Sequence, residues 1–562
     1  MKINASIGRK LRYGGVSAAL TALIIAAVII ANVIFSVLTR SFMLYSDLTP
    51  PLTFTLSEEC IKLIGEGDGS DSESPIDMVK KFREENKAYN AANGLKKGDE
   101  GYRDEELTLN IIFCDEPDAW EGNLMQRYVS HTARELEAEF SEYVNISYVD
   151  TVRNPSAVSK YKENSLSLIY DDTVIVECGS EFRTRRVSGF YTYDSATSTE
   201  PWAYSGEKAF AADIIAVTRT EAPVACIEVG HGVSYDDYQM LQTLADAGYD
   251  IQELRLATDE IPENCRLIII MNPKNDFTTG DDGISDIDEI GKLEKALENG
   301  TSLMVFMHPE TPRLEEFEGF LEEWGIVFDR SENGASHIVK DKTQSLTTDG
   351  YTIISEYAKE NRHSGIFRDL TSRPAPPSIV FKNAMSISYA PSFDVKTAYM
   401  NEDDQSTAYK YATKTVDGIT TSVYDVFTSS ENAEVWANGV AVPTTAPHKL
   451  MTVSSRTVIT SEGYFTGVSD HTYIFACGST DFASLEMLQK NSYGNNDALL
   501  SIFRTVGKEI VPIGLDPKAF SDTSIDIITT SQATQYTVVL TAVPAVITLV
   551  AGIVVLVRRK NR

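Results

Sequence analysis

Two long apolar runs near the ends of the chain frame a strongly acidic interior. The first run, residues 14–38, contains no charged residue and follows Lys2, Arg9, Lys10 and Arg12. At about 1.5 Å per residue it reaches roughly 37 Å, enough to cross a hydrocarbon core of about 30 Å. A cleaved signal peptide would have a shorter apolar region of roughly 7–15 residues. We therefore expect an uncleaved transmembrane helix.

The second uncharged run covers residues 536–557 and ends at the basic tail Arg558-Arg559-Lys560. Pro544 lies inside it, which transmembrane helices tolerate when neighbouring groups satisfy the freed carbonyl. Both tails are basic and contain no acidic residue, so the positive-inside rule places both termini in the cytoplasm. The sequence thus predicts a two-pass plasma-membrane protein that contacts lipid through two helices and holds one large domain outside.

The charge of the chain limits its partners. The formal net charge is −31, and both tails are positive, so the interior is more acidic still. Such a domain is not expected to bind nucleic acid, because binding depends on neutralising phosphates with basic side chains. Cations or basic protein faces are plausible partners, although a solvated acidic exterior is the simpler explanation.

The cysteines give no sign of a metal or redox centre. The chain has six, and no two form a CxxC pair. Those in strand-like apolar runs are expected to be buried free thiols. An exported domain would permit disulfides, but the spacing predicts no pairing. We expect neither a metal site nor a cofactor at Cys60, Cys114, Cys178, Cys226, Cys265 and Cys477.

The interior is too long for a single core, so we expect more than one domain. The proposed division is residues 1–40, cytoplasmic tail and first transmembrane helix; 41–106, juxtamembrane segment and acidic insertion; 107–220, thioredoxin-like module; 221–330, first part of an amidotransferase-like domain; 331–455, mixed strand and loop insertion; 456–535, final part of that domain; and 536–562, second transmembrane helix and tail.

Hydrophobic periodicity predicts the fold of these parts. Residues 107–114, 144–150 and 173–178 read as strands, with a helix over 122–143, which favours a small thioredoxin-like module without the redox CxxC. Residues 206–220 read as an amphipathic helix. Near-continuous apolar strands at 224–229, 267–273 and 302–309 alternate with helices, which is typical of a parallel sheet covered on both faces.

The predicted fold class is therefore α/β: the thioredoxin-like module plus a flavodoxin-like or glutamine-amidotransferase-like doubly wound parallel sheet, between two transmembrane α-helices. One helix of the sheet is expected to begin at Ser285, with Asp288 at the fourth position of a capping box. Residues 331–455 are harder to assign, and residues 473–482 are expected to rejoin the sheet.

The strongest candidate site is Gly230-His231-Gly232, together with Tyr235. It follows a predicted strand, and open α/β sheets bind ligands at the carboxyl ends of their strands. The interpretation we favour there is simpler, namely a tight strand-to-helix turn with an exposed histidine.

Catalytic motifs are missing from the sequence. It contains no GxxxxGK[ST], HExxH or GxSxG motif, so the chain is not expected to be an ATPase. His308 ends another predicted strand, but no Cys or Ser lies beside it to act as a nucleophile. The chain is therefore expected not to be an enzyme, and a hydrolase or amidase is the least favoured function.

Several segments occur in a characteristic order: RKLRYGGVSAALTALIIAAVIIANVI, then DLTPPLTFTLSEE, then residues 206–232, then CGSTDF with YGNNDALL at residues 477–500, and a closing apolar helix with a basic tail. This order resembles the GldG family, the gliding-motility-type auxiliary subunits of ABC transporters. The insertion at residues 65–106 is longer than the family pattern, and residues 331–455 do not match it cleanly.

The resemblance implies a bacterial source and an exported amidotransferase-like domain that is not known for catalysis. It also implies two partners, a separate ABC ATPase and a polytopic permease. The expected function is a non-enzymatic auxiliary subunit whose extracytoplasmic domain contacts the substrate or the cell envelope. The alternative is a membrane-anchored module that binds an envelope glycan or polymer at the Gly230–Gly232 edge.

Overall fold

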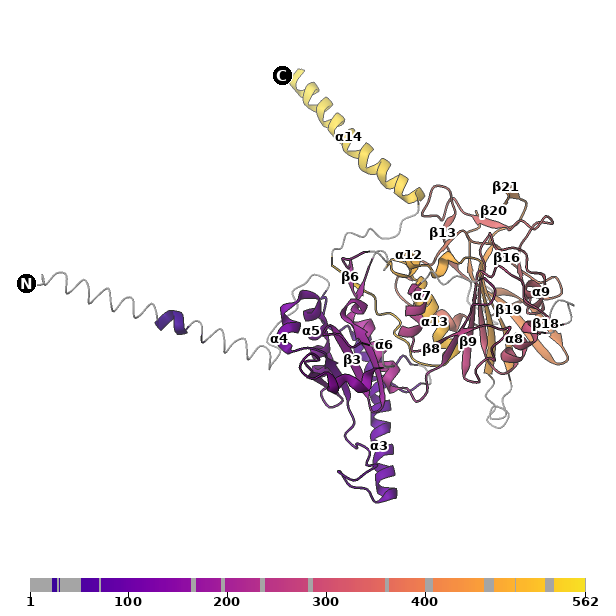
Figure 1. The fold of residues 1–562 in the computed structure, drawn as a ribbon. Helices are drawn as coiled ribbons and strands as arrows, with labels where there is room; N and C mark the ends of the chain where they lie inside the picture. Colours follow the sequence, from indigo (N-terminus) through magenta and orange to yellow (C-terminus); the bar gives the residue numbers. More distant parts are fainter. Residues whose placement is uncertain are drawn as a thin grey trace, which may run out of the picture.

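The chain folds into two α/β modules that lie side by side (Figure 1). The computed structural model describes residues 23–27, 30, 52–69, 72–162, 168–193, 198–232, 238–280, 287–358, 363–399, 408–458, 470–490, 492–520 and 530–560. The first module, up to residue 220, is coloured indigo to purple, and the larger second module is coloured magenta to yellow.

The first module is built on a four-stranded sheet with the order β2-β1-β3-β4. β1 (Leu109–Phe113) pairs parallel with β2 (Val144–Tyr148) and antiparallel with β3 (Thr173–Cys178), which in turn pairs antiparallel with β4 (Glu181–Arg186). The strands predicted at residues 107–114, 144–150 and 173–178 are thus present, whereas β4 was not predicted. β1 and β3 lie in the middle of the sheet and are buried at most positions, as their apolar sequences require.

Two helices precede β1, namely α2 (Glu58–Gly65) and α3 (Pro75–Asn93), and two follow it, namely α4 (Pro117–Gly122) and α5 (Leu124–Glu139). α3 has strong start and stop signals, because Ser74 accepts a hydrogen bond from the Asp77 amide and Gly94 ends the helix in the left-handed region. Only the start of α3 carries buried apolar side chains, and the rest of this highly charged helix projects from the module (Figure 1).

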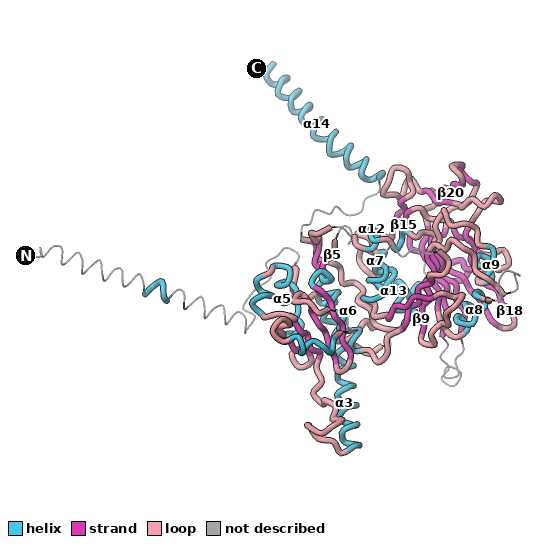
Figure 2. Tube along the Cα trace, viewed as in Figure 1, coloured by secondary structure: helices cyan, strands magenta, loops and turns pink. Residues whose placement is uncertain are grey.

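The helix α6 (Gly206–Thr218) lies between the modules. The sequence predicts an amphipathic helix here, but nearly every residue of α6 is buried, and Lys208 is the exception. The helix packs against α2, α3, α5, β3 and β4 of its own module and against α7 of the other (Figure 2). A helix that is apolar on all sides is stable only when covered on all sides.

The second module contains a mixed sheet of 12 strands, whose main path is β17-β18-β19-β22-β23-β10-β9-β7-β8. One half is parallel and consists of β8 (Asp250–Leu254), β7 (Val224–Glu228), β9 (Cys265–Met271), β10 (Ser302–Phe306) and β23 (Asp470–Cys477). The other half is antiparallel and consists of β22 (Lys449–Val458), β19 (Ile419–Thr428), β18 (Ala408–Val416) and β17 (Asp394–Tyr399).

This sheet corrects the predicted doubly wound parallel sheet. Several strands of residues 331–455 belong to this sheet, because β22 pairs with the last parallel strand and continues it, while other strands of this range form smaller separate sheets. Long hairpin strands such as β18 and β19 pair most readily with their neighbours in sequence, which makes this half antiparallel. The fold is therefore mixed α/β with large multi-stranded sheets.

Two hydrophobic cores cover the parallel half. Ala225 and Ile227 point into a core formed with α7 (Tyr238–Asp246) and α13 (Asn495–Gly507). Val224 and Cys226 point into a core formed with α8 (Glu289–Glu298) and α9 (Glu315–Glu323). Successive side chains of a strand face opposite sides, so a strand buried on both sides must be apolar throughout, as predicted here.

Smaller elements complete the described chain. They are β5 (Tyr191–Thr192), β6 (Ala203–Tyr204), β11 (Ile326–Phe328), β12 (Ile338–Lys340), β13 (Thr352–Ile354), β14 (Glu356–Tyr357), β15 (Val380–Lys382), β16 (Ile387–Tyr389), β20 (Glu434–Ala437), β21 (Val440–Val442), β24 (Lys518–Ala519), α10 (Arg368–Thr371), α12 (Leu485–Leu488), η1 (Pro155–Tyr161), η2 (Val187–Phe190), η3 (Ser364–Phe367) and η5 (Asp481–Ala483). β24 pairs with β6, so the end of the second module returns to the first.

The membrane prediction requires correction. Among the described residues, no helix combines the length and the apolar character needed to cross a bilayer. The first predicted span lies almost entirely outside the described residues, and α14 (Thr530–Lys560) does not meet the requirement in its described part. The predictions of a two-pass plasma-membrane protein, of an extracytoplasmic domain and of lipid contact through two helices are therefore wrong on this finding. The orientation inferred from the basic tails depended on those spans and is withdrawn with them.

Gly478 allows a close backbone contact where the two halves of the sheet meet. Its carbonyl accepts a hydrogen bond from the Met385 amide at 2.7 Å. A Cβ atom at Gly478 would lie 2.2 Å from the Met385 carbonyl oxygen. The clashing atoms belong to the Met385 backbone, which cannot rotate away as a flexible side chain could. We expect Gly478→Ala to lower the free energy of unfolding by about 1–3 kcal/mol, measured by urea denaturation of the intact chain.

Gly319 provides the control, because it lies inside α9 and a Cβ atom added there would have no other atom within 4 Å. Gly319→Ala should raise the stability by up to about 1 kcal/mol, since alanine favours a helix. Equal stability of Gly478→Ala and the natural chain would contradict the assigned contact.

Candidate ligand-binding site

The predicted residues Gly230, His231 and Gly232 follow the carboxyl end of β7. The His231 ring lies between two carboxylates, with Nδ1 3.0 Å from Glu228 Oε1 and Nε2 3.2 Å from Glu289 Oε2. Glu228 is the last residue of β7, and Glu289 is the first residue of α8. The Gly230 amide also donates to Glu228 Oε1 at 2.6 Å, which ties the turn to the strand end.

This cluster is closed to solvent. His231 is 5% exposed, Glu228 0% and Glu289 4%, and Phe277 stacks on the imidazole with ring centroids 3.7 Å apart. The interpretation of an exposed histidine is therefore wrong. Burial lowers the pKa of His231, but the bond to Glu228 and the charges of both glutamates outweigh it, so the pKa is raised.

The predicted site residues do not form an open pocket together. His231 is enclosed between two structural elements, Gly232 is exposed in the left-handed region, and Tyr235 lies outside the described residues. The cluster can hold the β7 turn against α8, and Phe277 covers a face of the imidazole.

The neighbouring strand ends are also tied by internal hydrogen bonds. Thr311 Oγ1 and Lys274 Nζ both donate to Asn272 Oδ1 at 2.8 Å. His308 Nδ1 accepts from the Glu310 amide at 3.1 Å, and burial lowers the pKa of this imidazole. The Ser479 hydroxyl, after β23, donates to the Lys382 carbonyl at 2.5 Å. These contacts hold the carboxyl edge of the sheet together and engage the hydroxyls of Thr311 and Ser479.

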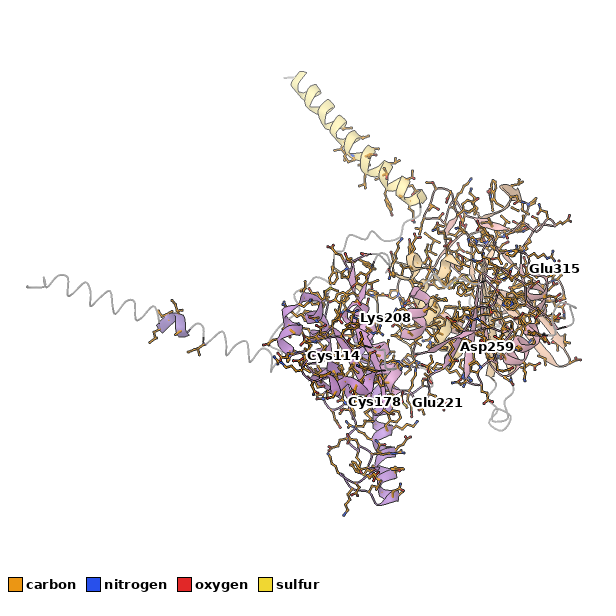
Figure 3. The ribbon with its side chains drawn as sticks, in the orientation of Figure 1. Cys114, Cys178, Lys208, Glu221, Asp259 and Glu315 are labelled. Carbon is orange, nitrogen blue, oxygen red and sulfur yellow. The ribbon has the colours of Figure 1, made fainter. Side chains whose placement is uncertain are left out.

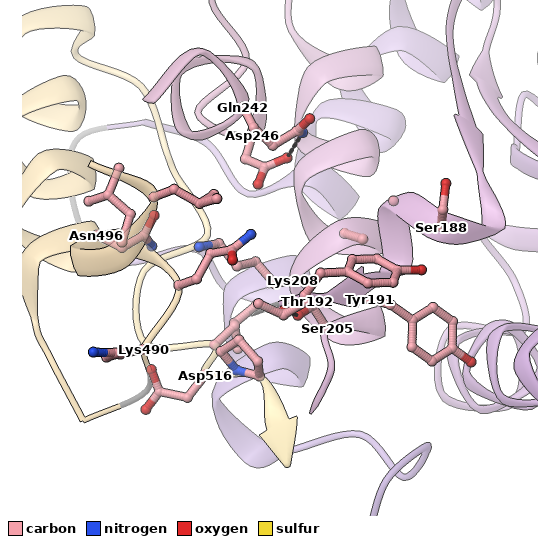
Figure 4. A pocket seen from close by; sticks show the side chains of 18 of the residues that line it. Ser188, Tyr191, Thr192, Ser205, Lys208, Gln242, Asp246, Lys490, Asn496 and Asp516 are labelled. Atoms are coloured by element: carbon pink, nitrogen blue, oxygen red, sulfur yellow. Dashed lines mark hydrogen bonds between the residues drawn. The ribbon is translucent and has the colours of Figure 1, made fainter. Parts of the chain in front are cut away.

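A larger opening lies at the junction of the two modules (Figure 4). This cavity has a volume of about 640 Å³. Its walls come from β4, η2, β5 and α6 of the first module and from α7, α12 and α13 of the second, with residues 515–517 closing one side. Ligand sites often form where two structural units meet, because neither unit alone encloses the space.

The wall of the cavity is mixed in character. Tyr193 and Tyr493 are half-buried, and Leu485, Leu488 and Leu515 add apolar surface. Thr192 Oγ1 and Ser205 Oγ lie 2.7 Å apart, and Gln242 Nε2 donates to Asp246 Oδ1 at 2.8 Å (Figure 4). Such a combination of apolar surface and a few placed polar groups is typical of small-molecule sites.

Most charges around the cavity are already compensated. Arg185 on β4 contacts Asp213 of α6 at 2.8 Å and Asp246 of α7 at 3.2 Å, so this arginine joins the two modules. Figure 3 draws the side chains of both modules. Asp497 pairs with Arg373 at 2.6 Å. The side chain of Asp516 is exposed at the cavity surface. Its pKa is nevertheless raised, mainly because the cavity walls remove part of its hydration and also because Asp497 lies nearby.

The cavity residues were not identified from the sequence, because they come from four separate segments without a local motif. The sequence carries one indirect indication of the cavity, namely the segments that resemble the GldG family. Two of the segments that carry the family resemblance, residues 206–232 and 477–500, supply Lys208, Tyr493, Asn496 and Asp497 to the wall.

The six cysteines are all free and buried. Cys226 and Cys265 lie on adjacent strands, with sulfur atoms 3.2 Å apart. In the part of the chain that the structure describes, no group of three or more His, Cys, Asp or Glu side chains could hold a metal ion.

Comparisons with known proteins give no family assignment. No protein-family model and no curated protein matches the chain. Among solved structures, it is similar to the mmIFT52 N-terminal domain, with 14% identity over 50% of this chain and 96% of that chain and a TM-score of 0.31. It is also similar to the cytoplasmic protein STM3548 from Salmonella typhimurium, with 10% identity over 50% of this chain and 98% of that chain and a TM-score of 0.25. These likenesses are too weak to support a functional inference.

Proposed function

We propose that this chain is a non-enzymatic accessory subunit of an ABC transporter, and that the cavity between its modules binds the ligand through which it acts. One observation carries the proposal. Residues 206–232 and 477–500, on which the resemblance to the GldG family partly rests, are far apart in the sequence but contribute Lys208 and Asn496 to the same cavity.

The composition of the wall favours binding over covalent catalysis. Nucleophilic catalysis requires an activated Cys, Ser, Thr or Lys beside a base. No histidine or cysteine is among the described residues that line the cavity, and the hydroxyls of Thr192 and Ser205 bond to each other. Asp246 is occupied by Arg185 and Gln242. The wall is therefore better suited to holding a ligand than to breaking a bond.

The proposal requires partners. The sequence has no phosphate-binding loop, so ATP hydrolysis must come from a separate ATPase, and transport must come from a polytopic permease. The acidic surface of the chain would favour docking to basic faces of such partners.

Affinity purification tests this function. The intact tagged chain would be purified from its own cells in mild detergent, and the proteins that accompany it would be identified by mass spectrometry. We expect an ABC ATPase and a multi-span permease in constant ratio to the chain. Repeated recovery of the chain with neither protein would refute the accessory-subunit proposal.

A second candidate, a glycan-binding module, is favoured by Tyr193 and Tyr493 together with the amides of Gln242, Gln489 and Asn496. Aromatic rings offer apolar faces, and amides both donate and accept hydrogen bonds. The cavity replaces the closed Gly230–Gly232 turn as the site for this function. Titration with cellotriose should then give binding that Tyr493→Ala weakens at least about tenfold, whereas binding insensitive to this change, or none, would exclude it.

A further inference from the structure

Two side chains of opposite charge line the cavity without an ion-pair partner. Lys208, near the start of α6, and Asp516, on the segment that leads to β24, both contribute to the wall (Figure 4). Neither makes an ion pair with any residue that the structure describes, and the attraction between them acts across a longer distance. Each charge therefore remains available to a ligand.

The other charged groups of the wall differ in this respect. Arg185 is held by two carboxylates, Asp497 by Arg373, and Lys490 lies 3.6 Å from Glu486. To use Arg185 or Asp497, a ligand would have to break a largely buried pair and leave its partner uncompensated. Lys208 and Asp516 can be used without that cost.

The surroundings of each group favour a particular ligand charge. Asp516 is exposed at the cavity surface and forms no ion pair with a described residue, so a positive ligand group would be attracted there. Lys208 lies in the first turn of α6, and Ser205 and Ala209 of the same turn also line the cavity. The start of a helix carries partial positive charge, which adds to the lysine in attracting an anion.

We propose that the cavity binds a small zwitterion, an amino-acid-like molecule or short peptide, with its ammonium group at Asp516 and its carboxylate at Lys208. This inference names the ligand class of the proposed binding subunit and rests on that function. A volume of about 640 Å³ accommodates a tripeptide. Leu485, Leu488 and Tyr493 would contact its apolar side chains.

Three matched peptides test each end of the ligand separately. The intact chain would be titrated calorimetrically with Ala-Ala-Ala, with its N-acetylated form and with its C-terminal amide. Acetylation removes the positive charge and adds a small acetyl group, and amidation removes the negative charge with little change in size. We expect each to weaken binding by about tenfold to hundredfold, the usual effect of losing a charge-assisted hydrogen bond.

Two variants test which side chain binds which end of the peptide. Asp516→Asn should abolish the preference for a free amino terminus and leave the preference for a free carboxylate. Lys208→Gln should do the reverse. Both side chains lie at the cavity surface, so neither change should unfold the chain. Lys490→Gln is the control, because this lysine lines the same cavity but is already paired, and we expect it to change the affinity by less than about twofold.

The zwitterion site would be established if Asp516→Asn lost only the preference for a free amino terminus and Lys208→Gln lost only the preference for a free carboxylate. Equal binding of the three peptides, an unchanged preference in both variants, or no binding of Ala-Ala-Ala at millimolar concentration would overturn it. Copurification with the ATPase and permease is measured independently, so the accessory-subunit proposal can stand when the ligand class fails.

Discussion

Replacing His231 with glutamine is expected to lower the free energy of unfolding by about 3–5 kcal/mol, the usual cost of removing one partner from a buried ionic group. The imidazole lies between Glu228 and Glu289, which are almost completely buried. Glutamine would leave the two carboxylates without the positive charge that compensates them. Urea denaturation of the intact chain at pH 6 measures the loss.

The effect should also depend on pH. The pKa of His231 is raised in the folded chain above its ordinary value of 6.5. Its charge therefore stabilises the fold fully below the unfolded pKa, and this contribution is lost as the pH rises through the folded pKa. The difference between the natural chain and His231→Gln should shrink above about pH 6.5.

His337 is a suitable control, because it is only half-buried and its ring lies 3.1 Å from the Ser331 hydroxyl. His337→Gln should cost less than about 1.5 kcal/mol, the net value of one ordinary hydrogen bond. A loss of the same size for both variants, or a His231→Gln difference that grows with pH, would be inconsistent with the buried cluster.

Replacing Arg185 with methionine should destabilise the junction of the modules by about 3–5 kcal/mol. Arg185 links Asp213 on α6 with Asp246 on α7, and all three side chains are largely buried. Methionine keeps most of the packing volume but leaves two carboxylates facing each other. Chemical denaturation measures the loss, and limited proteolysis should show faster cleavage near the junction.

The adjacent Arg186 offers a matched control. It pairs with Asp172 at 2.8 Å, but its side chain is 56% exposed, so Arg186→Met should cost less than about 1 kcal/mol. If both arginine variants lost the same stability, the junction would not depend on the Arg185 bridge.

Local sequence signals predicted the buried strands of both modules well. The segments around β1, β3, β7, β9 and β10 are apolar at nearly every position, and burial on both faces requires this pattern. Helix boundaries were less accurate. The capping-box interpretation placed the start of α8 at Ser285, whereas Asp288 is the N-cap, accepts from the Gly291 amide and starts the helix at Glu289.

The antiparallel half of the sheet carries a sequence signal of its own. Asp417 and Gly418 both have positive φ angles, 51° and 86°, between the long strands β18 and β19. An Asp-Gly pair between alternating strands is a strong indication of a tight hairpin. This signal accounts for the pairing of β18 with β19, but not for β22 joining them to the parallel strands.

The cavity could not be predicted by the same means. Its wall depends on α6 being buried between two modules and on residues 515–517 returning to the first module through β24. These contacts join residues hundreds of positions apart, and no local periodicity encodes them. The edge of the sheet was the predicted site because strand ends are easier to locate in a sequence than a junction between modules.

Hydrogen exchange of the intact chain with and without saturating Ala-Ala-Ala tests most directly whether the cavity or the sheet edge is the binding site. The account predicts slower exchange in residues 191–193, 205–209, 489–490, 493–497 and 515–516, segments that contribute residues to the cavity wall. Protection confined to residues 228–232, 272–275 and 307–311 at the carboxyl edge of the sheet, or no protection at all, would contradict it.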